Sequence, residues 1–344
     1  MNITAVAKRA GVSTATVSRV MNGTANVSPE TAERVRDAVE ALDFYPDVNA
    51  RALGSGRSGL YGLIISDITN PYFPELVKAF EDIAVEHGQD VLIANTDYDP
   101  KRMEMCVVRM LQRKVDGVAI MTSEMEDRLI RTLGQRQIPT IFMDTTTTGR
   151  GASTVNVDYT GGVMEAMRYL FELGHKEIAF ISGPLALGSA RARAEAFQAA
   201  LREHGVKMRP EWMQEGDHRV EGGHHAMKRI LDSGILPTAV LGSNDLTAIG
   251  AMGAIHERGL DIPGDISVIG FDDIELSAYT LPSLTTLRVP RREMASTAFR
   301  SLFRGREASP AKRVRQRTHV ITTKLVVRGS TGPAPANRKG GSQI

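Results

Sequence analysis

From residue 61 onward the chain alternates short apolar segments with longer amphipathic ones, and this alternation limits the folds open to it. The apolar segments occupy residues 61–66, 91–95, 117–121, 140–144, 154–157, 177–182, 239–243, 267–272 and 285–289, and a last strand pattern covers 318–328. The segments with helical period occupy residues 74–87, 102–114, 161–173, 189–203, 222–232, 245–258 and 291–303. Such alternation predicts parallel sheets with helices on both faces. Because the strands spread over about 270 residues, we expect two sheets rather than one.

The overall composition is that of a soluble globular protein. Of 344 residues, 42% are hydrophobic and 24% are charged, and the net charge is +2, so any contact with nucleic acid must come from local charge. The single cysteine, Cys106, rules out an intrachain disulfide, and we interpret it as a small buried hydrophobe rather than a redox group. The sequence shows no signal peptide and no apolar run near the ~20 residues of a membrane span. We therefore expect a cytoplasmic protein that contacts no membrane.

Residues 3–22 have the pattern of two short helices joined by a tight turn. Apolar stripes at helical spacing are formed by Val6, Ala7 and Ala10 and by Val17, Val20 and Met21. Gly11 can adopt the left-handed conformation that ends a helix, and Ser13 is placed to cap the next one. Facing outward on the second helix are Thr14, Ala15, Thr16, Ser18 and Arg19. A helix with this face can read bases in the DNA major groove, although an ordinary helical hairpin inside a larger core is the alternative on these residues alone.

A third helix and a glycine-rich linker follow. Ser28 can cap the helix and Pro29 fits its first position, so residues 1–46 form a small all-helical domain. Residues 47–59 contain Gly54, Gly56 and Gly59 and are predicted to link this domain to the rest of the chain. The glycines match G-x-G-x-x-G, but we reject a dinucleotide site, because that motif follows a strand and opens a helix, whereas this one precedes a strand.

Polar side chains gather where the predicted strands end, which is where open parallel sheets bind ligands. They are Asp67, Asn70, Asp144, Ser189, Arg191, Arg193, Asn244, Asp245, Asp272 and Asp273, with Tyr72 and Phe73 close by in sequence. Carboxylates, amides and an arginine match the paired donors and acceptors of vicinal hydroxyls, so the pattern predicts a cleft for a polyhydroxylated ligand. The alternative for any single residue is to cap the following helix, and we assign that role to Asp245.

Taken in order, these motifs resemble those of the lactose-repressor (LacI/GalR) family of bacterial transcription regulators over almost the whole chain. The matches are V-A-x-x-A-G-V-S-x-x-T-V-S-R-V-x-N from Val6, V-S-P-E-T from Val27, D-I-T-N-P-Y-F from Asp67, I-S-G-P from Ile181, S-N-D from Ser243 and D-I-S-V-I-G-F-D-D from Asp265. The resemblance implies an all-α helix-turn-helix head-piece at 1–46, a hinge helix at 47–59, and a core at 60–328 of two doubly wound parallel-sheet subdomains, like the periplasmic sugar-binding proteins. The first subdomain would comprise residues 60–159 and 290–316, and the second 160–288 and 317–328. The tail at 329–344 has no apolar periodicity and is predicted to be disordered.

The resemblance also implies which residues contact DNA. Thr14, Ala15 and Arg19 match the base-reading positions of the second helix, with Arg19 as a bidentate partner for guanine. Ser13, Thr16 and Asn22 would contact phosphates. Asn49 and Leu53 fall in the hinge helix, and Leu53 matches the leucine that wedges into the minor groove at the operator centre.

Further matches concern the effector cleft. Asp144, Arg193, Asn244 and Asp272 match positions that bind the effector in sugar-responsive members, and Phe73, Ser189 and His218 would line the same cleft. Leu187 and Arg219 stand where purine-responsive members carry other polar side chains, which argues against a purine.

We therefore expect a transcriptional repressor that binds a near-palindromic double-stranded operator as a homodimer under the control of a small carbohydrate effector, without catalysis, cofactor or metal. The tail lacks a leucine heptad, which argues against a tetramer. A transport-type sugar-binding protein would instead carry a secretion signal and no head-piece. An enzyme built on the same sheets would need a reactive site, and the sequence has no Walker loop, G-x-S-x-G or H-E-x-x-H motif and no paired zinc ligands. We interpret His218, His224 and His225 as solvated or cleft histidines rather than metal ligands.

Overall fold

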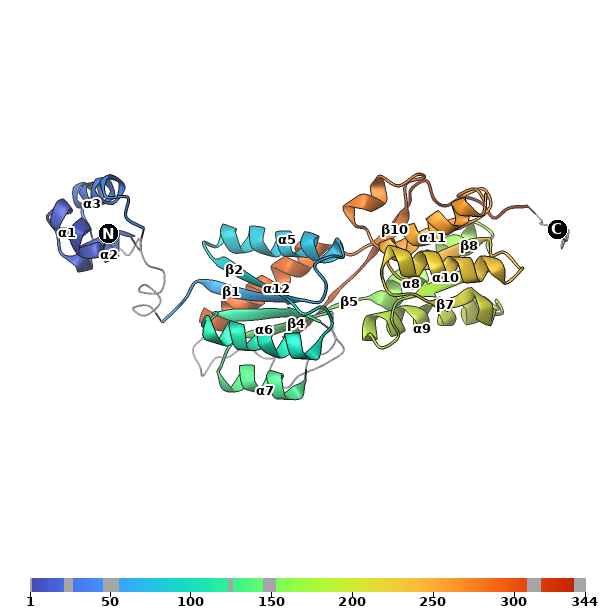
Figure 1. Ribbon diagram of the computed structural model, residues 1–344, viewed down its shortest axis with the longest axis horizontal. Helices are drawn as coiled ribbons and strands as arrows, with labels where there is room; N and C mark the ends of the chain where they lie inside the picture. Colours follow the sequence, from blue (N-terminus) through green and yellow to red (C-terminus); the bar gives the residue numbers. More distant parts are fainter. Residues whose placement is uncertain are drawn as a thin grey trace. The chain divides into compact units, whose positions relative to one another are not determined.

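The computed structural model describes residues 2–21, 27–45, 56–122, 126–144, 153–307 and 317–336. Its contacts divide the chain into two units, Met1–Gly59 and Leu60–Ile344. The first unit is all-helical, and the second consists of two α/β subdomains with parallel sheets (Figure 1). The predicted fold class is confirmed.

The first unit is a bundle of three helices, α1 (Ile3–Ala10), α2 (Thr14–Met21) and α3 (Pro29–Ala41). Gly11 ends α1 in the left-handed conformation, with φ of +64°. The hydroxyl of Ser13 accepts a hydrogen bond from the backbone N–H of Thr16 at 3.1 Å and so caps α2. One fully buried valine from each helix forms the centre of the core, namely Val6, Val17 and Val35. The turn and the apolar stripes thus lie where the sequence predicts them.

The first subdomain of the second unit contains a sheet in the order β11-β5-β4-β3-β1-β2. Its strands are β1 (Leu60–Ile65), β2 (Asp90–Asn95), β3 (Gly117–Met121), β4 (Thr140–Met143), β5 (Ser153–Val157) and β11 (Thr318–Ile321). Its helices are α5 (Tyr72–Glu86), α6 (Pro100–Gln112), α7 (Asp127–Gln135) and α12 (Arg291–Glu307). Side chains of β1 alternate between the faces, so that Leu63 belongs to a cluster with Phe80 of α5 and Phe299 of α12, whereas Ile64 packs with Met103 of α6.

The second subdomain repeats this plan with the sheet order β12-β10-β9-β8-β6-β7. Its strands are β6 (Ile178–Ser182), β7 (Met213–Glu215), β8 (Ala239–Gly242), β9 (Ser267–Asp272), β10 (Thr285–Arg288) and β12 (Lys324–Val326). Its helices are α8 (Tyr159–Glu172), α9 (Gly188–Glu203), α10 (Val220–Asp232) and α11 (Asp245–Glu257), with 3-10 turns η1 (Pro210–Trp212) and η2 (Glu275–Ala278). Phe180 of β6 stacks on Phe197 of α9 at 4.9 Å, while Ile181 faces the cluster of α10 and α11.

Within the described residues, three connections join the two subdomains: β5 to α8, β10 to α12 and β11 to β12. β11 pairs in parallel with β5 of the first sheet, and β12 pairs antiparallel with β10 of the second. The assignment of residues 317–328 to the second subdomain is therefore wrong for β11. The chain leaves the first sheet after Ile321 and enters the second at Lys324, although its sequence reads as one strand.

The prediction that the tail is disordered from residue 329 is also wrong, because residues 329–336 pack against the second subdomain. Ser330 is fully buried, and its hydroxyl donates to the carbonyl of Val268 at 2.6 Å while it accepts from the N–H of Thr285 at 2.8 Å. The N–H of Ala334 donates to the carbonyl of Leu173 at 2.8 Å. Hydrogen bonds rather than an apolar stripe hold this segment, and residues 337–344 lie outside the described residues.

Candidate functional site

A cleft opens between the two subdomains at the carboxyl ends of both sheets. Its lining comprises Ser66, Asn70, Tyr72, Phe73, Tyr98, Met121, Thr122, Asp144, Tyr159, Leu187, Ser189, Arg193, His218, Asn244 and Asp272. The cleft has a volume of about 550 Å³, which includes open solvent at its mouth. Polar and aromatic side chains from both subdomains converge on this cleft, which is typical of a small-molecule site.

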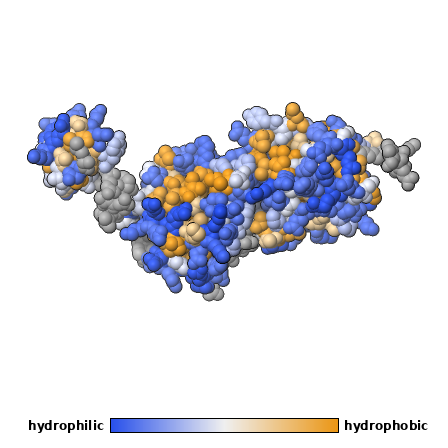
Figure 2. All heavy atoms as spheres, in the orientation of Figure 1, coloured by the Kyte–Doolittle hydropathy of each residue, from blue (hydrophilic) through white to orange (hydrophobic). Residues whose placement is uncertain are grey.

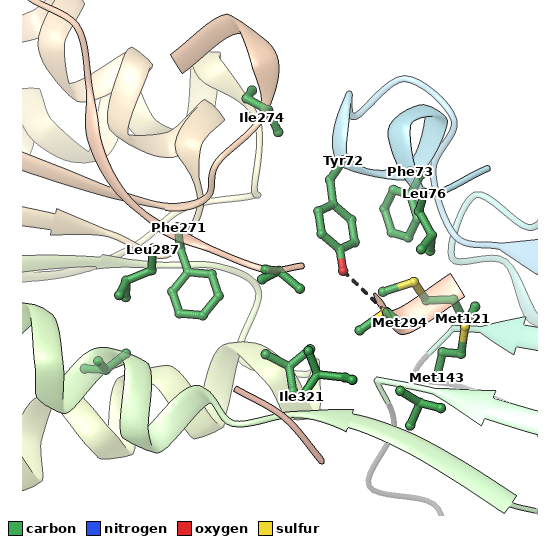
Figure 3. Packing of buried hydrophobic residues seen from close by; sticks show 14 of the residues in the cluster. Tyr72, Phe73, Leu76, Met121, Met143, Phe271, Ile274, Leu287, Met294 and Ile321 are labelled. Carbon is green, nitrogen blue, oxygen red and sulfur yellow. Dashed lines mark hydrogen bonds between the residues drawn. The ribbon is translucent and has the colours of Figure 1, made fainter. Parts of the chain in front are cut away.

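The turn between β1 and α5 supplies the aromatic part of the first wall. Asn70 accepts the N–H of Tyr72 at 3.1 Å, which fixes the start of α5 and directs two consecutive rings. Tyr72 and Phe73 pack edge to face at 5.5 Å, and the hydroxyl of Tyr72 lies 3.8 Å from the sulfur of Met294 (Figure 3). Burial raises the pKa of Tyr72 well above its ordinary value, and Asp144 and Asp272 add to this, so the phenol stays neutral.

Asp144 follows β4 and takes a left-handed conformation, with φ of +53°. Burial raises the pKa of its carboxyl group, and a hydrogen bond from the Tyr159 hydroxyl and the charge of Arg193 partly offset this rise. The Asp144 carboxyl group thus lies beside Tyr159 and Arg193 in the wall of the cleft, where its remaining lone pairs can accept hydrogen bonds from a ligand.

Arg193 of α9 brings a buried positive charge into the cleft; the residue is 4% exposed. Its guanidinium lies 4.6 Å from the ring centre of Tyr159 and 5.0 Å from that of Phe271, close enough for cation–π attraction. Nη2 donates to Nε2 of His218 at 3.3 Å, whereas Nε finds no hydrogen-bond partner among the described residues. A buried donor without a partner costs free energy, and a ligand oxygen could satisfy it.

His218 is neutral and serves as an acceptor in this network. Burial, together with the charge of Arg193, lowers its pKa to about 3. Its Nε2 accepts from Arg193 and from the hydroxyl of Ser243 at 3.0 Å, which requires the proton to sit on Nδ1. A Cβ atom on Gly183 would lie 1.9 Å from this Nε2, so only glycine leaves room for the imidazole ring.

Asn244 takes the capping role that the sequence analysis assigns to Asp245. Asn244 caps α11, because its side-chain oxygen accepts the N–H of Thr247 at 2.9 Å, and its amide nitrogen donates to the carbonyl of His218 at 3.0 Å. Asp245 is fully buried and accepts instead from the N–H of Ile274 at 2.8 Å and from the hydroxyl of Thr286. The assignment of Asp245 as the cap is therefore wrong: the sheet packs over Asp245, and the cap falls one residue earlier.

Asp272 ends β9 with its carboxyl group in the cleft. Burial raises its pKa to about 7, even though Arg193 and Arg291 act to lower it. The next residue, Asp273, points away from the cleft and accepts from Arg288 at 2.5 Å and from Arg328 at 2.6 Å. The Asp272 carboxyl group thus faces the cleft, whereas the Asp273 carboxyl group stabilises the turn that carries Asp272.

One ion pair spans the cleft beside this lining. Nη2 of Arg219, which precedes α10, lies 3.3 Å from Oδ2 of Asp67, which follows β1. The other oxygen of Asp67 accepts from the N–H and the hydroxyl of Thr69. Arg219 was expected at a ligand-contact position, and here it pairs with the opposite subdomain.

All seven effector candidates from the sequence line this cleft: Phe73, Asp144, Ser189, Arg193, His218, Asn244 and Asp272. Sequence reasoning missed Tyr98 and Tyr159. Tyr98 comes three residues after the end of β2, so the rule that pointed to the other strand ends could have found it, whereas Tyr159 begins a helix and reads as an ordinary helical residue. Burial raises the pKa of Tyr98 to about 12.

The DNA candidates on α2 lie on one surface of the head-piece. Ser13, Thr14, Ala15 and Arg19 are exposed, and Thr16 is half-buried. The hydroxyls of Ser13 and Thr16 lie 2.9 Å apart. The other three candidates, Asn22, Asn49 and Leu53, lie outside the described residues.

The described part of the chain offers no group of three or more His, Cys, Asp or Glu side chains arranged to hold a metal ion. His224 pairs with Glu257 at 2.9 Å instead. Among the helices of these residues, none has the length and apolar character needed to cross a membrane.

The sequence and the fold of this chain are both similar to those of known bacterial regulators. Residues 2–47 match the model of bacterial regulatory proteins of the lacI family, and residues 167–331 match the periplasmic binding protein-like domain. The chain is 37% identical over 334 residues to the HTH-type transcriptional repressor PurR of Erwinia tasmaniensis, which covers 96% of each chain. A structure of the Lac repressor dimer bound to operator and the anti-inducer ONPF superimposes with a TM-score of 0.86 and 30% identity, over 96% of this chain and 99% of that one.

A structure of the transcriptional regulator CelR in complex with cellobiose superimposes with a TM-score of 0.72 and 26% identity, over 96% of this chain and 99% of the other. The helix-turn-helix head-piece and the two-subdomain core are thus the two parts of the chain that the family models match. The chain belongs to the LacI family of ligand-responsive, DNA-binding transcriptional repressors.

Proposed function

We propose that this protein represses transcription from a near-palindromic operator as a homodimer in the cytoplasm, and that a small carbohydrate in the cleft controls its affinity for DNA. The observation that carries the choice of ligand is the set of polar groups in the cleft. Asp144, Arg193 and Asp272 bring two carboxyl groups and one guanidinium to a single cavity with aromatic walls.

These groups suit vicinal hydroxyls. Each hydroxyl both donates and accepts, so a carboxylate and an arginine together satisfy it. Asp144 and Asp272 would accept from ligand hydroxyls, and Nε of Arg193, which has no partner among the described residues, would donate to a ligand oxygen. Tyr72, Phe73 and Tyr98 would pack against the apolar faces of the ring. The related structure with cellobiose supports this ligand class.

On DNA, the exposed face of α2 would enter the major groove. Arg19 would read a guanine, Thr14 and Ala15 would contact neighbouring base edges, and Ser13, Thr16 and Asn22 would contact phosphates. Asn49 and Leu53 would complete the site at the operator centre. The related Lac repressor structure, a dimer on its operator, supports this arrangement.

The dimer would form through the first subdomain. β2 is an edge strand of its sheet, and Ile93 of β2, Val85 of α5 and Met105 and Val108 of α6 are exposed apolar side chains. Figure 2 shows apolar residues gathered on the face of this subdomain that the view presents. Exposed apolar side chains beside an unpaired strand edge favour association with a second copy. A two-fold dimer would present two head-pieces to two half-sites.

The connections between the subdomains would link the ligand to the DNA. A ligand that prefers one relative position of the subdomains shifts the equilibrium toward it, and a coupling of about 1–3 kcal/mol changes operator affinity roughly 5- to 150-fold.

The ligand is testable by thermal unfolding of the full chain with D-ribose, D-glucose, D-galactose, cellobiose and their available phosphates, and with the purine bases hypoxanthine and guanine. A ligand at 100 times its Kd stabilises the folded state by about 2.7 kcal/mol, which is readily seen as a shift in Tm. We expect a carbohydrate to give such a shift, Asp272→Asn to abolish it, and Asp232→Asn, at an exposed pair with Arg258, to retain it. A shift with a purine base alone, or with no carbohydrate, would overturn the proposed ligand class.

A further inference from the structure

The turn that carries Asp272 is bound from the opposite subdomain by Arg291. Arg291 is the first residue of α12, which packs in the first subdomain, whereas Asp272 and Asp273 belong to the second. Nη1 of Arg291 donates to the carbonyl of Asp272 at 2.6 Å, and Nη2 donates to the carbonyl of Asp273 at 2.7 Å. One planar guanidinium thus binds two consecutive backbone carbonyls across the boundary between the subdomains.

The backbone of this turn needs such support. Asp272 and Asp273 have φ angles of +113° and +56°, in a region that residues other than glycine rarely adopt. Conformations of this kind cost on the order of 1–3 kcal/mol each and persist only where neighbouring groups fix them. The strained turn directs the Asp272 carboxyl group into the cleft, so any group that holds the turn also positions that carboxyl group.

Glu75 of α5 adds further contacts between the first subdomain and this turn. Its Oε2 lies 2.7 Å from Nη2 of Arg291, and its Oε1 accepts the N–H of Glu275 at 2.9 Å. The pair is largely shielded from water, with 16% of the Arg291 side chain and 27% of the Glu75 side chain exposed. Two elements of the first subdomain therefore bind the 272–275 segment of the second at three backbone atoms.

We propose that Arg291 and Glu75 form a clamp that positions Asp272 for the ligand and makes its position depend on how the two subdomains meet. Arg291 acts through the carbonyls of the turn and not by touching the ligand. Separation of the subdomains would break the three backbone contacts, relax the strained turn and withdraw the carboxyl group. The clamp rests on the proposed function only in taking the cleft as the ligand site.

The neighbouring residue supplies a matched control. Arg292 also lies on α12 and pairs with a glutamate of α5, because its Nη2 is 2.9 Å from Oε1 of Glu86. This pair is exposed, at 68% and 56% of the two side chains, and both residues belong to the first subdomain. Arg291→Gln and Arg292→Gln therefore remove the same kind of ion pair from the same two helices, and only the first removes contacts to the second subdomain.

The direct readout is the pKa of Asp272, measured by ¹³C NMR of the full chain with labelled aspartate and assigned with Asp272→Asn. The charged groups that act on this carboxyl group are Arg193, Arg291, Asp144 and Glu75, and it acts in turn on Asp245. Arg291→Gln should lower the pKa toward its ordinary value, because release of the turn exposes the carboxyl group to water, whereas loss of the positive charge alone would raise it. Arg291→Lys keeps the charge but cannot bind both carbonyls, so it should lower the pKa as well, and Arg292→Gln should not move it.

A second readout is amide hydrogen exchange of residues 272–277 without ligand. Arg291→Gln and Arg291→Lys should both speed exchange about tenfold, because lysine restores the charge but cannot bind both carbonyls. Arg292→Gln should leave exchange unchanged. The clamp is wrong if Arg291→Gln and Arg292→Gln give the same exchange, or if Arg291→Gln raises the pKa while Arg291→Lys leaves it unchanged, as loss of the charge alone would do.

The carbohydrate panel, repeated with these variants, separates the two proposals. Arg291→Gln should weaken a binding carbohydrate at least tenfold, and Arg292→Gln should not. If no carbohydrate binds the wild-type chain, the proposed ligand class fails, while the pKa and exchange measurements still decide whether the clamp exists.

Discussion

Replacing Asp272 by asparagine should stabilise the second subdomain above neutral pH while it removes ligand binding. Asp272 is 8% exposed, and burial raises the pKa of its carboxyl group from 3.8 to about 7. In the folded chain the proton is therefore held more tightly than in the unfolded chain. Stability is full below the unfolded pKa and falls as the pH rises toward the folded pKa, because ionisation of the buried group then opposes folding.

The size of the effect follows from the shift. Three pKa units at 1.36 kcal/mol each correspond to about 4 kcal/mol lost between pH 4 and pH 8. The linkage relation puts roughly half of this loss, about 2 kcal/mol, between pH 5.5 and pH 8. Asparagine has no proton to lose, so the advantage of Asp272→Asn over wild type should grow by about 2 kcal/mol across this range.

The assay is urea unfolding of the full chain at one protein concentration, at pH 5.5 and at pH 8. The single tryptophan, Trp212, is a suitable probe, because it is buried in the second subdomain with its Nε1 donating to the carbonyl of Ile235 at 3.0 Å. Comparing the two pH values cancels any cost of the substitution that does not depend on pH.

Asp232→Asn is the control, because Asp232 is an exposed carboxylate of the same subdomain in a surface pair with Arg258. Its difference from wild type should be nearly the same at both pH values. An advantage of Asp272→Asn that does not grow from pH 5.5 to pH 8 would refute the argument that burial raises the pKa of this carboxyl group.

Three further predictions concern other parts of the chain. A Cβ atom on Gly250 would lie 2.0 Å from the backbone oxygen of Val220, so Gly250→Ala should lower the free energy of unfolding by about 1–3 kcal/mol, measured by the Trp212 assay; an unchanged value would show that α10 and α11 can separate at no cost. Truncation after Arg328 should lower Tm, because it removes the buried Ser330 and its two hydrogen bonds; a dispensable tail would leave Tm unchanged. Arg19→Ala should weaken binding to the operator far more than to random DNA in fluorescence anisotropy, and equal losses on both would contradict base reading.

Local sequence signals predict the head-piece because its turn chemistry is local. Gly11 supplies a left-handed residue and Ser13 supplies a cap, and both act within three residues of their own position. The α/β core can also be predicted from the sequence, because strands buried on both faces give continuous apolar runs. The three-residue strand β7 escaped notice because it is too short to show a period, whereas α7 was overlooked although Leu129 and Leu133 form a buried apolar face on it.

The rest could not be predicted because tertiary contacts decide it. Residues 318–328 alternate as one strand, and nothing local marks the point where the chain passes from the first sheet to the second. Asn244 and Asp245 are both good caps, and only the sheet packed over Asp245 assigns the cap to Asn244. Arg291 likewise reads as a surface arginine, and its role depends on carbonyls of residues far away in sequence.

In the cleft, strand ends alone give most of the polar residues. They do not give their protonation states, which depend on how many neighbours exclude water. Asp272 and His218 have pKa values of about 7 and about 3, and neither value has a signal in the sequence.

We propose above that a small ligand in the cleft controls binding of the head-piece to DNA. Its most direct test selects operator sequences from a random DNA library with the full chain. The Kd for the selected DNA is then measured by fluorescence anisotropy at fixed salt, with and without the carbohydrate that stabilises the protein. We predict a near-palindromic sequence whose Kd changes roughly 5- to 150-fold with the ligand, and loss of that change in Asp272→Asn. The same Kd with and without a ligand that stabilises the core would contradict the account.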